Sequence, residues 1–124
     1  MRFDHLHLLC RDLEKSVSWY RDVLGAKVTL RSEATGRKIV RMDLAGMKLA
    51  LSPWSGPEQG ADRVAGPGAY QIGFMVDDLE NTLRDLQGKK VKPTRGPLQI
   101  KPGLLAAFIQ DPDGVEVELM QETG

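Results

Sequence analysis

The chain contains two copies of one pattern, and this repeat restricts the fold more than any other feature of the sequence. Residues 5–14 align with residues 71–80 without a gap, and both stretches are largely apolar runs that end in Asp-Leu-Glu. Residues 45–51 align in the same way with residues 113–119. A unit of this size rarely buries its apolar face alone, so we expect the two copies to pack into one domain.

The same order of elements is expected in each copy. Alternating apolar residues predict strands, and apolar residues at helical spacing predict one helix per copy. Asp12 and Asp78 are the expected N-caps, and Gly25 is an expected helix stop. The expected strands are 3–11, 27–31, 38–44 and 47–52, then 70–76, a stretch near Val91, 104–110 and 115–121, and the expected helices are 13–24 and 79–86.

The sequence therefore predicts an α+β fold, in which two βαβββ modules form a curved, mixed, eight-stranded sheet (a cup) with the helices outside. The modules would be residues 1–52 and 70–124 of a single domain over residues 1–124, joined by a glycine- and proline-rich linker at 53–69. A second loop is expected at 93–103, because this segment holds three prolines.

Charge and cysteine content exclude several classes of protein. Seventeen basic and seventeen acidic side chains balance, and the chain lacks the basic stripe of a nucleic-acid-binding protein. No apolar run approaches the roughly 20 residues that span a bilayer. A single cysteine excludes an intrachain disulfide, and the first residues lack the apolar core of a signal peptide. We therefore expect a cytoplasmic protein with neither a nucleic-acid nor a membrane partner.

The repeat makes two pairs of positions equivalent, His5 with Gln71 and Ala50 with Glu118. Three of these four residues carry a side chain that can bind a metal: an imidazole, an amide and a carboxylate. This mixed set suits Mn, Fe(II), Ni, Co, Zn or Mg, with water in the open positions. The structural alternative is that all three are ordinary polar residues of half-exposed strands.

Four segments carry a family resemblance: Phe3-Asp4-His5-Leu6-His7, Arg11-Asp12-Leu13-Glu14-Lys15-Ser16, Trp19-Tyr20-Arg21-Asp22-Val23-Leu24-Gly25 and Asp111-Pro112-Asp113-Gly114-Val115-Glu116-Val117-Glu118-Leu119. They resemble the vicinal oxygen chelate superfamily, which includes glyoxalase I, the fosfomycin and bleomycin resistance proteins, methylmalonyl-CoA epimerase and the extradiol dioxygenases. The resemblance implies a glyoxalase-like domain with a divalent metal in an open cup, ligands on the first and last strands of the modules, and a homodimer.

This resemblance predicts a metalloenzyme in which His5, Gln71 and Glu118 hold one divalent ion (Mn, Fe, Ni, Co or Zn). The ion would chelate oxygens of a small substrate during an isomerisation, a transfer to an epoxide or an oxygenation. Glyoxalase I uses four ligands and Ala50 cannot bind a metal, so classical glyoxalase I activity is not expected. The alternative is a metal-free protein of the bleomycin-resistance kind, which binds and sequesters a small molecule.

Other candidates share a strand face or a loop with these residues. His7 lies about 7 Å beyond His5 on one strand face and would be the catalytic acid or base, because imidazole titrates near neutral pH. The alternatives are a replacement metal ligand and a hydrogen bond in the cup wall. The candidates for substrate binding are Lys48, Trp54, Arg95, Lys101 and Glu116. Lys48 and Glu116 are equivalent under the repeat, so an ion pair between them is the alternative; packing or surface charge is the alternative for the others.

Overall fold

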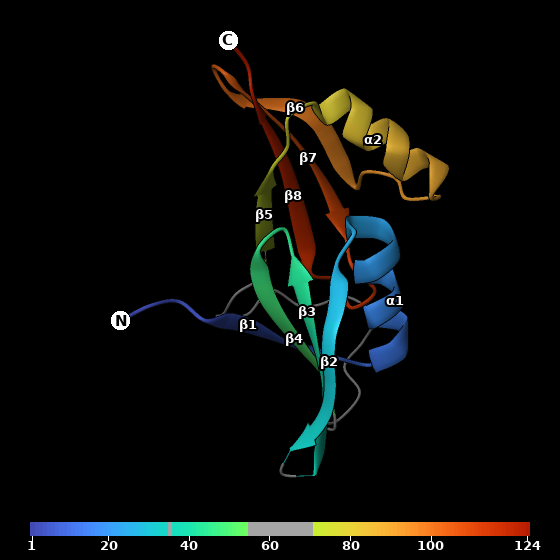
Figure 1. The fold of residues 1–124 in the computed structure, drawn as a ribbon. Helices are drawn as coiled ribbons and strands as arrows, with labels where there is room; N and C mark the ends of the chain where they lie inside the picture. The colour runs from blue at the N-terminus through green and yellow to red at the C-terminus, as the bar shows by residue number, and fades with distance from the viewer. Residues whose placement is uncertain (35, 55–70) are drawn as a thin grey trace. The chain divides into compact units, whose positions relative to one another are not determined.

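A computed structural model describes residues 1–34, 36–54 and 71–124. The chain divides into two compact units, Met1–Gln59 and Gly60–Gly124, and each unit contains one βαβββ module (Figure 1). The strands of the described residues form two four-stranded mixed sheets, one in each unit. The α+β class and the two modules predicted from the sequence are therefore confirmed.

The first unit consists of one mixed sheet and one helix. The strand order is β1-β4-β3-β2, in which β1 runs parallel to β4 and the other neighbours are antiparallel. The helix contacts β1 and β4. The elements are β1 (His5–Cys10), α1 (Leu13–Leu24), β2 (Lys27–Ala34), β3 (Arg37–Leu44) and β4 (Met47–Pro53).

The local sequence explains where α1 begins and ends. The Asp12 carboxylate caps the helix by accepting a hydrogen bond from the Lys15 backbone N–H at 3.1 Å. Gly25 follows the last turn at φ 77°, in the left-handed region where a residue without a Cβ is favoured. Val17 and Tyr20 are buried, and burying each of them stabilises the unit by roughly 2 kcal/mol.

The second unit repeats this arrangement. The strand order is β5-β8-β7-β6, with β5 parallel to β8 and the other neighbours antiparallel. The helix contacts β7 and β8, and the Asp78 carboxylate accepts a hydrogen bond from the Asn81 backbone N–H at 3.0 Å. The elements are β5 (Gln71–Met75), α2 (Leu79–Gly88), β6 (Arg95–Lys101), β7 (Leu104–Gln110) and β8 (Glu116–Glu122).

Strand pairing confirms that the two copies are structurally equivalent. In both units the first strand is parallel to the last, and the residues that match in the sequence occupy the same positions in the pairing. The pairs His5–Lys48 and His7–Ala50 correspond to the pairs Gln71–Glu116 and Gly73–Glu118. The repeat seen in the sequence is thus a repeat of strand register.

Two expectations for the segment after α2 are wrong. The strand expected near Val91 begins only at Arg95, and the loop expected at 93–103 contains β6. β6 is the outer strand of its sheet and all its residues are exposed, so it lacks the alternating burial that reveals a strand. Pro97 is tolerated there, since edge strands and bulges leave backbone N–H groups unpaired and the register shifts between Arg95 and Leu98.

The linker expected at 53–69 lies outside the described residues, except for Pro53 and Trp54. The packing of both modules into one domain therefore stays a prediction. Within the described ranges, no helix has the length and apolar character needed to cross a membrane.

Candidate metal and substrate site

The candidate residues of the first unit lie on one face of its sheet. Directly paired residues of neighbouring strands project to the same side, so His5 and His7 share a face with their partners on β4. The neighbouring positions Leu49 and Leu51 project to the opposite side and are buried. We call the polar side the histidine face, and it consists of His5, His7, Lys48, Ala50 and Ser52.

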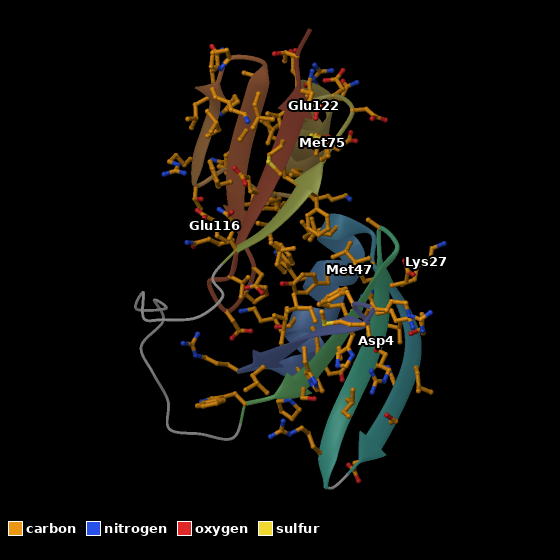
Figure 2. The ribbon with its side chains drawn as sticks, turned by 90° about the vertical axis from the view of Figure 1, so that its left-hand side faces the viewer. Asp4, Lys27, Met47, Met75, Glu116 and Glu122 are labelled. Carbon is orange, nitrogen blue, oxygen red and sulfur yellow. The ribbon has the colours of Figure 1, made fainter. Side chains whose placement is uncertain are left out.

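His5 is held by a carboxylate from the residue before it. Its Nδ1 lies 2.8 Å from Asp4 Oδ2, and Lys48 Nζ lies 3.5 Å from the other oxygen of the same carboxylate. The pKa of Asp4 is lowered, first by the hydrogen bond with His5 and then by the charge of Lys48. Figure 2 labels Asp4 just ahead of β1. The carboxylate therefore occupies one ring nitrogen of His5 and leaves Nε2 for another partner.

His7 is fixed in a different way. Its Nε2 lies 2.8 Å from Ser52 Oγ, and Ser52 is completely buried. Burial lowers the pKa of His7, and the positive charges of His5, Arg37 and Arg41 lower it further. The ring centroids of His7 and His5 are 6.2 Å apart. The two imidazoles therefore lie close together, with separate hydrogen-bond partners.

The candidate residues of the second unit share one face of its sheet in the same way. Gln71 pairs with Glu116 and Gly73 with Glu118 between β5 and β8; Glu118 in turn pairs with Phe108, and Phe108 with Arg95. We call this side the carboxylate face, and it includes Gln71, Gly73, Arg95, Phe108, Glu116 and Glu118. Figure 2 labels Glu116 and Glu122 toward opposite ends of β8.

Gln71 and Glu118 are set up differently on this face. Gln71 Nε2 donates a hydrogen bond to Glu116 Oε2 at 2.7 Å, so the amide oxygen is left for another partner. A Cβ built on Gly73 would lie 3.2 Å from Met120 Cε and 3.8 Å from Glu118 Oε1. The Glu118 carboxylate and the Met120 methyl group therefore both lie close to this glycine.

Arg95 is positioned by an aromatic ring that the sequence patterns did not single out. Its guanidinium carbon lies 4.1 Å from the centroid of the Phe108 ring, within the range of a cation–π contact. The strand near Val91 was placed too early, so the register that sets Arg95 opposite Phe108 was missed. Asp4 was missed as a partner of His5 as well, although it stands next to His5 in the sequence.

The structure brings some candidates together and separates others. Arg95 and Lys101 lie at opposite ends of β6, because Lys101 pairs with Leu104 beside the β6–β7 turn. Trp54 follows β4 and is 40% exposed. Ala50 is completely buried and has no metal-binding group. An ion pair between Lys48 and Glu116, the alternative to substrate binding, would require residues of both units and stays untested.

No three His, Cys, Asp or Glu side chains gather to hold a metal within either unit, as far as the chain is described. The predicted set does not require such a cluster, because it draws His5 from the first unit and Gln71 and Glu118 from the second. The predicted set also contains the amide of Gln71, and glutamine is not one of these four residue types.

Known proteins match the chain across both modules. A family model described as the glyoxalase/bleomycin resistance protein/dioxygenase superfamily matches residues 2–119. The chain belongs to this superfamily. The resemblance seen in the sequence motifs is therefore confirmed.

Several curated proteins are similar to this chain. Mitochondrial methylmalonyl-CoA epimerase from Mus musculus is 33% identical, over 97% of this chain and 72% of that protein. A probable lactoylglutathione lyase from Vibrio cholerae is 30% identical, over 97% of this chain and 90% of that protein. The chain spans only 35% of a chloroplastic probable lactoylglutathione lyase from Arabidopsis thaliana, which is 28% identical over 94% of this chain.

A solved structure of the same superfamily shares the fold. The glyoxalase family protein from Enterococcus faecalis matches with a TM-score of 0.81 and 17% identity, over 96% of each chain. Superfamilies of this kind support several reactions on one fold, so membership alone does not select the chemistry.

Proposed function

We propose that the chain is a metal-dependent enzyme that acts on a small molecule, with His5, Gln71 and Glu118 as its metal ligands. One observation carries this proposal: two of the three ligands already have the outer hydrogen-bond partner that metal ligands usually have, namely Asp4 for His5 and Glu116 for Gln71. The ligands come from both units, so the proposal requires them to converge on one ion, within a chain or across a homodimer.

His5 suits this role. A proton on Nδ1, donated to the Asp4 carboxylate 2.8 Å away, fixes the tautomer in which Nε2 carries the lone pair that a metal needs. Carboxylate–histidine–metal arrangements of this kind orient the imidazole and raise its basicity. Asp4 would then be a positioning residue of the site.

Gln71 and Glu118 also suit a role as metal ligands. The amide N–H of Gln71 donates a hydrogen bond to Glu116, which leaves the amide oxygen to bind a cation. Glu118 adds a carboxylate on the same face of the sheet. One imidazole nitrogen and two oxygens favour an ion such as Mn, Fe(II), Ni, Co or Zn.

The chemistry divides between the ion and the chain. A bound divalent ion supplies polarisation of a substrate oxygen and stabilises the negative charge that develops on it. His7 would transfer the proton, since it lies beside His5 on the histidine face and the buried Ser52 hydroxyl fixes its ring. The names of the relatives include a methylmalonyl-CoA epimerase and probable lyases. The stereocentre of a methylmalonyl group lies next to carbonyl groups, and its inversion follows from loss and return of its acidic proton. We therefore favour proton transfer over oxygenation.

The cellular setting belongs to the same proposal. We infer a cytoplasmic homodimer that has a small molecule as its substrate. Lys48 and Trp54 would approach this substrate from the first unit, and Arg95, Lys101 and Glu116 from the second.

A second function is favoured by one specific observation. Ala50 stands at the equivalent of Glu118, where a fourth ligand would lie, and it has no donor atom. A metal-free protein of the bleomycin-resistance kind, which sequesters a small molecule, would need no metal ligand at this position. Metal binding separates these two functions.

The test measures the melting temperature of the chelator-treated protein as Mn²⁺, Ni²⁺ or Zn²⁺ is added. An ion at a hundred times its Kd stabilises the folded state by about 2.7 kcal/mol, which corresponds to roughly 10 °C for a chain of this size. Glu118→Ala should abolish the shift. Glu122→Ala, an exposed carboxylate on the same strand, should keep it. No shift with any of these ions, or equal shifts in both variants, would contradict the metal site.

A further inference from the structure

The carboxylate face carries a cation, an aromatic ring and a carboxylate in one row across three strands. Arg95 of β6 pairs with Phe108 of β7, and Phe108 pairs with Glu118 of β8. Neighbouring strands are about 4.8 Å apart, so the backbones of Arg95 and Glu118 are roughly 10 Å apart.

The guanidinium of Arg95 is held in place and keeps its donors available. It lies 4.1 Å from the centroid of the Phe108 ring, and this ring is only 2% exposed. Stacking engages the flat face of a guanidinium, whereas its N–H groups point outward from the edge. In the described part of the second unit, no carboxylate lies within ion-pair distance of Arg95. Its charge is therefore available to an anion.

The backbone next to Arg95 has an irregular conformation. The strand register shifts immediately after it, and a bulge of this kind redirects a side chain. Gly96 has φ 83°, and a Cβ there would lie 2.7 Å from the backbone oxygen of Ala106. Only glycine fits at this position, so the local chain conformation that presents Arg95 depends on it.

We propose that Arg95 determines substrate specificity by binding a carboxylate of the substrate, which makes the substrate a small organic acid. This inference rests on the proposed function, because the metal near Glu118 would take other oxygens of the same molecule. A carboxylate matches the planar fork of a guanidinium with two parallel hydrogen bonds. The stacking on Phe108 reduces the conformational freedom that Arg95 loses when it binds.

The test uses succinate and its neutral counterpart succinamide, which have the same carbon skeleton. Isothermal titration follows each probe into the Mn²⁺-treated wild type, Arg95→Gln and Arg84→Gln. We expect succinate to bind the wild type at least tenfold more tightly than succinamide does. Arg95→Gln should lose at least tenfold in succinate affinity, whereas Arg84→Gln, which removes an exposed arginine of α2, should keep it.

Three results would overturn the inference: equal succinate affinity in Arg95→Gln and wild type, equal binding of succinamide and succinate, or preferential binding of methyl phosphate that depends on Arg95. Mn²⁺ titration of Arg95→Gln keeps the two proposals separate. Because Arg95 is no metal ligand, this variant should bind Mn²⁺ like the wild type. If the wild type binds no Mn²⁺, the metal site fails, and the succinate titration of the metal-free protein still decides the role of Arg95.

Discussion

At the scale of single residues, the candidate site consists of pairs of side chains that fix one another. Asp4 holds His5, Ser52 holds His7, and Glu116 holds the amide of Gln71. Outer partners of this kind orient a ligand and tune its donor strength. Changing a partner should therefore weaken metal binding even when every ligand is kept.

Glu116→Ala tests this expectation. The variant keeps Gln71 but removes the acceptor that directs its amide nitrogen away from the ion, so the affinity for Mn²⁺ should fall about 10- to 100-fold. Glu122→Ala on the same strand is the matched control. Isothermal titration with Mn²⁺ measures both, and an unchanged affinity in Glu116→Ala would show that Gln71 needs no such partner or is no ligand.

The charges around His7 give a second prediction. Burial lowers the pKa of His7 most, followed by His5, Arg37 and Arg41. Arg41→Gln should therefore raise this pKa, as measured by NMR titration of the imidazole protons in the metal-free protein, and Lys38→Gln should not. The stability gained from neutral His7 is present above the unfolded pKa of about 6.5 and is lost as the pH falls through the lower folded value. The same titration curve in wild type and Arg41→Gln would contradict this account.

At the scale of elements, β6 combines an exposed surface with an unusually constrained backbone. Gly96 has a positive φ, and a Cβ at this position would meet the backbone of β7. Gly96→Ala should therefore lower the free energy of unfolding by about 2 kcal/mol. Gly88→Ala, at the end of α2 with nothing within 4 Å of the added Cβ, should stabilise the protein slightly or leave it unchanged. Urea denaturation distinguishes the two, and equal effects would mean that β7 moves aside.

The helices and the inner strands follow from the sequence because their signals are local. Asp12, Asp78 and Gly25 mark helix ends through contacts with residues three or four positions away. The inner strands are rich in apolar residues, which form a continuous run in β7 and alternate with polar residues at the start of β8. β6 contains only a short alternation, from Leu98 to Lys101, after a glycine and a proline that favour a loop. The contact between Arg95 and Phe108 depends on how β6 pairs with β7, so the sequence patterns could not predict it.

At the scale of the whole molecule, the repeat explains why the ligand set is divided. Each module places its first strand beside its last, so each contributes at most two of the four candidate ligand positions. His5 belongs to the first unit, and Gln71 and Glu118 to the second. The sequence identified these positions because the repeat is exact enough to align them. How the modules combine depends on interactions between surfaces, which no local pattern encodes.

The central claim, that His5 and Glu118 bind one ion together, is tested most directly by a double-mutant cycle with Mn²⁺ measured by isothermal titration. Ligands of one ion are strongly coupled, whereas distant sites contribute additively. We predict one ion per chain, a loss of at least a hundredfold in affinity for His5→Ala and for Glu118→Ala, and little further loss in the double variant. Wild-type affinity in either single variant, or two independent losses that add in full, would contradict the shared site.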